Sequence, residues 1–144
     1  FFLGSLIPVV LMSLVVNVLC TFIAGFDMEP SQWISFLAIT VACSSISAVI
    51  GMIFGIFAKT QVSASTITTP ALLIFMMIPM FSGFGETLEK VSGLLFTGII
   101  FNAIANIDNG LPVTDMKGII VLAAEFLVSV IIFLALYRKN GFER

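Results

Sequence analysis

Histidine is absent from this chain of 144 residues, and cysteine occurs only twice. Without histidine the commonest general base of enzymes is missing, and a site of histidine and cysteine ligands for a metal cannot be assembled. Cys20 and Cys43 both lie in apolar runs, so we interpret them as small buried hydrophobic residues and expect no disulfide. We expect neither a metal site nor a cofactor in this chain.

Charge is also scarce. Only 10% of the residues are charged and 60% are hydrophobic, whereas a soluble domain has about 25% charged residues. Lysine and arginine number 6 together and form no basic patch, which argues against nucleic acid as a partner. The apolar runs are long and unbroken, without the alternation of a barrel strand. The composition therefore predicts an all-α integral membrane protein in a lipid bilayer.

The common catalytic motifs are missing as well. The sequence has no GxxxxGK[ST] phosphate loop, no HExxH and no GxSxG. The chain is thus predicted not to be an enzyme, and we assign no catalytic residue.

Four segments are apolar and long enough to cross a bilayer, which takes about 20 helical residues. They are residues 2–26, 33–57, 62–84 and 118–137. A further segment, 87–107, holds an apolar run of only 17 residues from Val91 to Ile107, interrupted by two glycines and two asparagines. It could be a marginal span, an interfacial helix or a re-entrant element; its length favours four spans over five.

The ends of the chain bear on its completeness. The sequence opens in apolar residues without a methionine and without a basic leader, so 1–26 does not match a secretory signal peptide. We treat 1–144 as a single transmembrane domain and expect further helices upstream of it.

Several residues have predicted structural roles in the spans. Ser31 is a candidate N-cap of the second span, and Trp33 is a candidate interfacial anchor. Ser47, Gly51 and Gly55 form a small-residue face that we expect to pack against another helix of the same subunit. In the third span, Pro70 and Pro79 predict kinks, with nearby serine and threonine hydroxyls bonding the freed carbonyls.

Two polar residues inside the spans are the candidate site residues. Asn17 lies near the middle of the first span and can make an interhelical hydrogen bond or contact a substrate. Glu125 is the one acidic residue inside a span, a costly position that marks a functional site by default. It can hydrogen-bond a serine, threonine or asparagine of a neighbouring helix, or it can bind a cation or relay a proton.

Basic residues predict the orientation. With four spans, Lys59, Arg138, Lys139 and Arg144 lie on one side, against Lys90 and Lys117 on the other. Cytoplasmic loops carry the excess of lysine and arginine, so the C-terminus is predicted to be cytoplasmic, with Asp27 and Glu29 outside. A fifth span leaves the same ratio and the same side for the C-terminus.

The order of these segments resembles the C-terminal part of the permease subunit of ABC-2-type transporters, the bacterial exporter class of ATP-binding-cassette systems. The matching stretches are a small-residue helix ending in GMIFGIFAKT, then QVSASTITTPALLIFMMIPMFSGF, then the polar segment ETLEKVSGLLFTGIIFNAIAN, and a last helix with a basic tail. The resemblance covers nearly the whole chain.

The resemblance implies a permease of the cell membrane that pairs with a second permease subunit and with a separate ATP-binding-cassette ATPase. It would export a peptide, a drug-like molecule or an ion. Two other interpretations stay open on the residues themselves: an ATP-independent channel, and a structural subunit of a membrane complex.

Overall fold

The computed structural model describes residues 2–58 and 60–140, and nearly all of them are helical. The described part contains no strand. The helices are α1 (Phe2–Ala24), α2 (Pro30–Phe57), α3 (Gln61–Met80), the short 3₁₀ helix η1 (Ser82–Phe84), α4 (Glu86–Gly93), α5 (Phe96–Asp108) and α6 (Met116–Asn140). The chain is an all-α protein of the membrane-spanning kind, as the sequence predicts.

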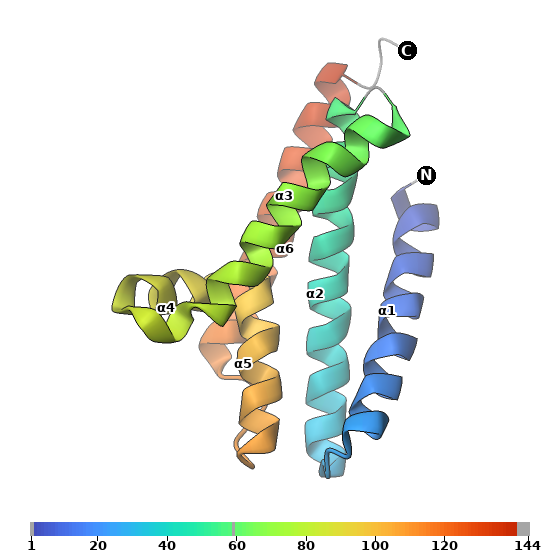
Figure 1. Cartoon of the computed structure of the whole chain (residues 1–144). Coiled ribbons are helices and arrows are strands. Elements are labelled where there is room, and N and C mark those ends of the chain that lie inside the picture. Colours follow the sequence, from blue (N-terminus) through green and yellow to red (C-terminus); the bar gives the residue numbers. More distant parts are fainter. Residues whose placement is uncertain (1, 59, 141–144) are drawn as a thin grey trace.

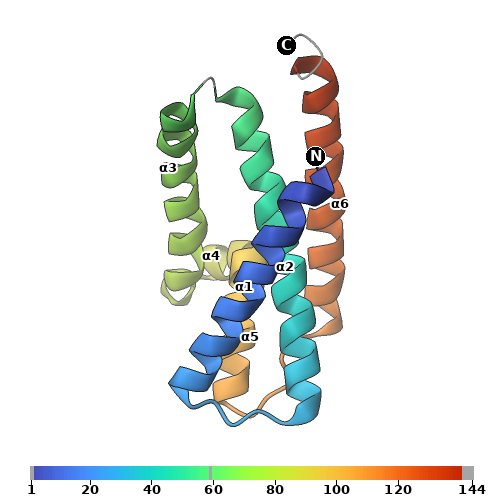
Figure 2. The same cartoon turned by 90° about the vertical axis from the view of Figure 1, so that its right-hand side faces the viewer.

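Helix α2 lies at the centre of the bundle and contacts α1, α3, α5 and α6 (Figure 1). Figure 2 shows α1 crossing in front of α2, with α3 and α6 on either side. Helices α1 and α3 run away from the end of the bundle at which α6 terminates. Helices α2 and α6 run in the opposite direction. The order therefore alternates in direction, as expected of four successive spans.

Four helices are long and apolar enough to cross a membrane: α1, α2, α3 and α6. Each corresponds to one predicted span. The segment predicted as re-entrant or interfacial forms α4 and α5, which meet at an angle of 98°. At about 1.5 Å per residue, the 8 residues of α4 and the 13 of α5 are each too short to cross a core of about 30 Å.

Two predicted boundaries at the α1–α2 turn are wrong by a few residues. Helix α1 ends at Ala24 because Gly25 adopts a φ of +71°, a left-handed conformation that glycine tolerates and that commonly stops a helix. Helix α2 begins at Pro30, and its N-cap is Glu29 rather than Ser31. The Gln32 side-chain oxygen accepts from the Glu29 backbone N–H at 3.0 Å, which fixes this cap.

The third span is shorter than predicted. Thr60 caps α3 by accepting a hydrogen bond from the Ser63 N–H at 3.1 Å, and the α-helix ends at Met80. Beyond it the chain tightens into η1, where glycines at 83 and 85 disfavour a further α-helical turn. Pro70 and Pro79 both lie inside α3, which continues through them, so the predicted kinks stay predictions.

Hydroxyl groups beside Pro70 bond carbonyls of α3, but in no described hydrogen bond do they reach the carbonyl that the proline frees. Thr68 and Thr69 donate to the carbonyls of Ala64 and Ser65, each at 2.8 Å. Pro70 cannot bond the carbonyl of Thr66, because it lacks an N–H. The threonines thus bond carbonyls of the turn that precedes the proline, and each such bond stays within α3.

The bend between α4 and α5 depends on Gly98. A Cβ atom at this position would collide with the carbonyl oxygen and the hydroxyl of Ser92. The last turn of α4 is therefore pressed onto the first turn of α5, and only glycine leaves room for it. The N–H groups of Leu94 and Leu95 close this turn on the carbonyls of Val91 and Ser92, both at 3.1 Å.

The apolar core joins α2, α5 and α6. Its members recur every three or four residues, which places them on one face of each helix. They are Phe36, Ile39, Cys43 and Ile46 of α2, Phe96, Ile99, Ala103 and Ile107 of α5, Val113 of the following loop, and Leu122 of α6.

The predicted packing face on α2 is not covered. Gly51 and Gly55 are exposed, and a Cβ added to either would have no described atom within 4 Å. The prediction that another helix of this subunit packs on them is therefore wrong for the described residues. Ser47, one turn before Gly51, is half-buried. The α1–α2 contact instead uses Ser13 and Ser44, whose hydroxyl oxygens lie 2.6 Å apart.

Candidate functional site

Glu125 lies nine residues after the first residue of α6, about 14 Å along the helix axis. The backbone of Phe96, the first residue of α5, lies beside its carboxylate. The first N–H groups of a helix have no partner within the helix, and a negative charge there is favourable. Leu95, the N-cap, supplies no side-chain hydrogen bond. Glu125 of α6 therefore stands beside the N-terminus of α5.

The predicted structural partner of Glu125 was a serine, threonine or asparagine side chain. The Oε2 oxygen of Glu125 is buried and has no hydrogen-bond partner among the described residues, so the described structure supplies no such side chain to this oxygen. A buried oxygen without a partner carries a free-energy penalty of about 1–3 kcal/mol, so it is available to a proton or to a small donor.

Cys43 of α2 completes this junction of three helices. Its thiol donates to the Phe96 carbonyl at 3.5 Å, and it interacts electrostatically with Glu125. Phe96 of α5 thus accepts from Cys43 of α2 through its carbonyl and lies beside Glu125 of α6. Cys43 is free and buried as predicted, whereas Cys20 is free but exposed on α1, so its interpretation as a buried residue is wrong.

Asn17 belongs to a different polar set, between α1 and α2. Its amide donates to the carbonyl and to the hydroxyl of Ser13, at 2.8 and 3.3 Å, within its own helix. The direct link to α2 is made by Ser13, whose hydroxyl oxygen lies 2.6 Å from that of Ser44. The Ser44 hydroxyl also reaches the Thr40 carbonyl at 2.6 Å. The interhelical hydrogen bond predicted for Asn17 is therefore made by Ser13, one helical turn earlier.

Asn17, Ser13, Ser44 and Thr40 form one chain of hydrogen bonds. Each serine hydroxyl has a single proton and can therefore donate only once. Asn17 donates to Ser13, Ser13 to Ser44 and Ser44 to the backbone of Thr40. The sequence contains a signal for this set that our reading missed: Ser13, Asn17 and Thr21 recur every four residues, on one face of α1. Asn17 and Glu125 share no hydrogen-bond partner, so the two predicted site residues do not form one site.

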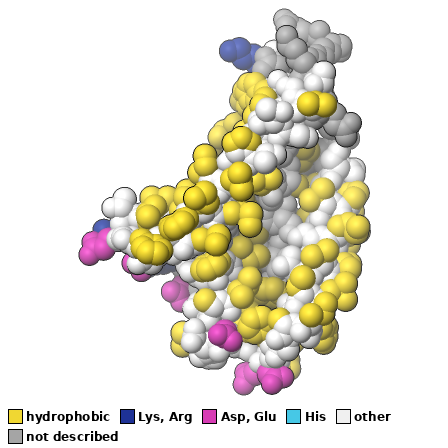
Figure 3. Space-filling view, viewed as in Figure 1, with side chains coloured by type: hydrophobic (Ala, Val, Ile, Leu, Met, Phe, Trp, Pro, Cys, Tyr) yellow, Lys and Arg dark blue, Asp and Glu magenta, His cyan; other side chains and the backbone are white. Residues whose placement is uncertain are grey.

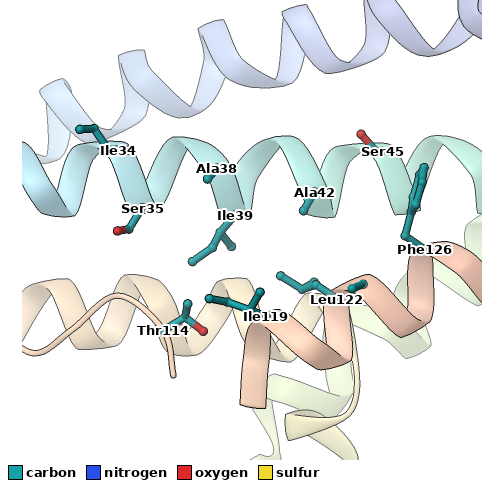
Figure 4. Close-up of a pocket in the computed structure, with 11 residues that line it drawn as sticks. Ile34, Ser35, Ala38, Ile39, Ala42, Ser45, Thr114, Ile119, Leu122 and Phe126 are labelled. Carbon is teal, nitrogen blue, oxygen red and sulfur yellow. The ribbon is translucent and has the colours of Figure 1, made fainter. Parts of the chain in front are cut away.

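A hollow of about 560 Å³ lies between α2 and α6. Figure 4 shows Ile39 of α2 and Ile119 and Leu122 of α6 pointing into it from facing helices. Its polar lining consists of the hydroxyls of Ser35, Ser45 and Thr114. No charged described residue lines it, and Glu125 does not open into it, so it offers an acyl chain or another apolar group a surface without charge selectivity.

Comparisons with known proteins add no name to this arrangement. A scan against models of protein families found no matching model, and searches of curated proteins and of solved structures found no match. The function is therefore inferred from the residues and the geometry described above.

Proposed function

We propose that this multi-pass membrane protein is the permease part of an ATP-driven exporter similar to ABC-2-type transporters. The observation that supports the proposal best is the bent pair α4–α5 between the third and the last long apolar helix. The resemblance implies short helices at that place, with a last span that ends in basic residues. Helix α6 carries Arg138 and Lys139 in its last turn.

The chain is proposed to lie in the cell membrane with its C-terminus in the cytoplasm. Figure 3 shows acidic side chains gathered at the end opposite the last turn of α6, and others on α4. Among the described basic residues, Arg138 and Lys139 stand in the last turn of α6, whereas Lys117 lies at its start and Lys90 lies in α4. The predicted ratio of four basic residues on the cytoplasmic side to two on the other side also counts Lys59 and Arg144. These two lie outside the described residues.

In this proposal the permease has no catalytic residue of its own. A second permease subunit and a separate ATPase complete the exporter, and ATP-driven closure of the ATPase pair moves the helices. The cargo is a peptide, a drug-like molecule or an ion.

Purification of the tagged protein from its native membrane in a mild detergent tests the assignment. We expect a protein with a GxxxxGK[ST] phosphate loop to co-purify and to hydrolyse ATP. A tagged, unrelated multi-pass protein from the same membrane is the control. ATP-independent ion currents from the purified chain alone in a planar bilayer, with no ATPase bound, would contradict the proposal and favour the channel.

Labelling of single cysteines in intact cells tests the orientation. We expect an impermeant thiol reagent to modify a cysteine placed at Glu29 and to leave one placed at Lys139 unmodified until the cells are opened. Cys20 and Cys43 are replaced by serine in both variants. The reverse pattern would contradict the proposed topology without affecting the ATPase test.

A further inference from the structure

The hollow between α2 and α6 adjoins a second, polar hollow at the end of the bundle. The first, which we call the groove, runs along α2 from Ile34 to Ser45, a rise of about 16 Å. The polar hollow has a volume of about 350 Å³ and lies between the start of α2 and the loop that precedes α6. Ser35 and Thr114 line both hollows, so the two are contiguous. Figure 4 shows these two residues at one end of the groove and Phe126 at the other.

The groove asks for no hydrogen bonds from an occupant along α2. The Ser35 hydroxyl donates to the Ser31 carbonyl at 3.0 Å, and the Ser45 hydroxyl donates to the Val41 carbonyl at 2.7 Å, so both hydroxyls are bonded within α2. Apart from these and Thr114, the lining is apolar. Side chains around an unfilled space lose dispersion contacts, and an alkyl chain from the bilayer restores them without placing a polar group in the groove.

The size of the groove favours an alkyl chain over a helix. A helix with its side chains is about 10 Å across, so a stretch of about 16 Å fills about 1,200 Å³. The groove has a volume of only about 560 Å³. Ile39 and Leu122 line it and also belong to the buried core, so its floor is closed. A helix can therefore lie only over the groove, whereas a single chain fits inside it.

The polar hollow offers hydrogen-bond acceptors rather than donors. Among the described residues that line it, Glu29 alone is charged. The N–H groups of Gly110 and Leu111 already donate to carbonyls of α5, at 3.0 and 2.8 Å, and Pro112 has no N–H. The Gln32 amide donates to the Leu111 carbonyl at 3.4 Å. A group that enters this hollow meets a carboxylate and carbonyl oxygens, which suits a cationic donor.

We propose that the two hollows form one site for a phospholipid of the surrounding bilayer whose headgroup carries an ammonium ion, such as phosphatidylethanolamine. One acyl chain lies in the groove, and the headgroup ammonium donates to the Glu29 carboxylate in the polar hollow. A lipid of the same chain length without the ammonium fills the groove equally well but lacks the contact with Glu29. The groove therefore supplies binding, and the polar hollow supplies selectivity for the headgroup.

Lipid binding here requires a chain in a membrane and no ATPase. The proposed function adds only the leaflet, because it places the turn between α1 and α2 outside and hence the headgroup in the outer leaflet. The two ideas are separable. Lipid binding is measured on the purified chain, whereas the exporter assignment is tested by the co-purifying ATPase.

Native mass spectrometry of the full chain tests the site, after equilibration in detergent with equal amounts of phosphatidylethanolamine and phosphatidylglycerol that have the same acyl chains. We expect the phosphatidylethanolamine adduct to predominate. Glu29→Gln removes the charge and keeps the backbone N–H that bonds Gln32, so the preference should fall about two- to fivefold, as for loss of an exposed ion pair. Asp27→Asn, at an acid of the same turn outside the polar hollow, should leave the preference unchanged.

Variants that fill the groove test the place of the acyl chain. Ala38→Phe on α2 and Ala123→Phe on α6 each put a ring into the groove from an exposed position, so both lipid adducts should fall about tenfold. Ala135→Phe is the matched control, because this exposed position of α6 lines neither hollow. Circular dichroism should give the same helix content for all variants.

Four outcomes would each overturn the proposal. Equal adducts of the two lipids on the unaltered chain would remove the headgroup selectivity. Unchanged adducts in both groove variants, or an equal loss in Ala135→Phe, would place the acyl chain elsewhere. A lipid-free dimer that Ala38→Phe separates into monomers would show that a second copy of the chain covers the groove.

Discussion

Helices α1 and α2 are similarly apolar in sequence, yet they have opposite surroundings in the bundle. In the most apolar stretch of α2, 39% of the residues are buried, against 6% in α1 and 6% in α3. In water, apolar side chains are driven inward, but lipid tails are as apolar as leucine and give no such drive. The difference shows that packing and polar contacts, rather than hydropathy, decide which helix is central here.

The contacts of α2 fit this explanation. It supplies the Cys43 thiol to the α5 backbone and the Ser44 hydroxyl to α1, and four of its residues belong to the apolar core. Helix α1 meets α2 through the Ser13 hydroxyl and the Phe22 ring, and several of its apolar side chains, such as Leu11, Val15 and Leu19, are more than half exposed. The following substitutions test this contrast.

The largest effect is expected from Ile46→Ala in α2. Ile46 is fully buried, so its truncation should leave a cavity and lower the free energy of unfolding by about 2–4 kcal/mol. The matched control is Leu11→Ala in α1, whose side chain is 57% exposed and should matter little. Unfolding of both variants in detergent, followed by circular dichroism, measures the difference. Equal losses would contradict the contrast between α1 and α2.

Gly98→Ala should have the next largest effect. The added Cβ collides with Ser92, so the α4–α5 bend has to open, at a cost of about 1–3 kcal/mol in unfolding free energy. Gly93→Ala is the control, because a Cβ there meets no described atom within 4 Å. Thermal unfolding in detergent compares the two. A lower midpoint for Gly93→Ala than for Gly98→Ala would show that the bend does not depend on Gly98.

These two positions also show what the sequence could reveal. The four spans are predictable because each is a long apolar run, and the break at 86–108 is predictable because its apolar run is short. The need for glycine at Gly98 is not predictable, since it arises from a contact with Ser92 across the bend. Gly51 and Gly55 are the opposite case. Their spacing is a common helix-packing motif in the sequence, yet no described atom packs on them in the structure.

The candidate site was predictable only in part. Glu125 stands out in the sequence as the single acid in a span, and the structure places it at a helix junction. Its neighbour at that junction is the backbone of Phe96, and every residue has a backbone, so no side-chain pattern could identify Phe96. The Asn17 set was detectable through the four-residue spacing of Ser13, Asn17 and Thr21.

A smaller effect is expected at Glu125. Glu125→Leu removes the negative charge beside the N-terminus of α5 and should lower the free energy of unfolding by about 0.3–1 kcal/mol. Glu125→Gln keeps an oxygen that can accept from Phe96, so we expect it to keep both the fold and export. Thermal unfolding and export from cells measure the two properties. Loss of export by a normally assembled Glu125→Gln protein would show that the carboxylate acts on cargo or protons.

The smallest effect on the isolated chain is expected from Gly51→Leu. The position is open in this subunit, so the midpoint of unfolding in detergent should be unchanged. Any loss should appear in assembly instead, because a second subunit that packs closely on Gly51 and Gly55 would be displaced. Size-exclusion chromatography with light scattering separates the two outcomes. A large fall in the unfolding midpoint of the monomer would contradict the open face.

The position of Glu125 beside the N-terminus of α5 has a consequence for the order of biosynthesis. The ribosome completes α5 before it begins α6, since Phe96–Asp108 precedes Met116–Asn140 in the chain. The N-terminus of α5 therefore waits for a partner that has not yet been made, although its contact with Cys43 of α2 can already form. Only when α6 enters the membrane does the nascent bundle gain its last contact, which makes docking of the short helices a late, post-insertion step.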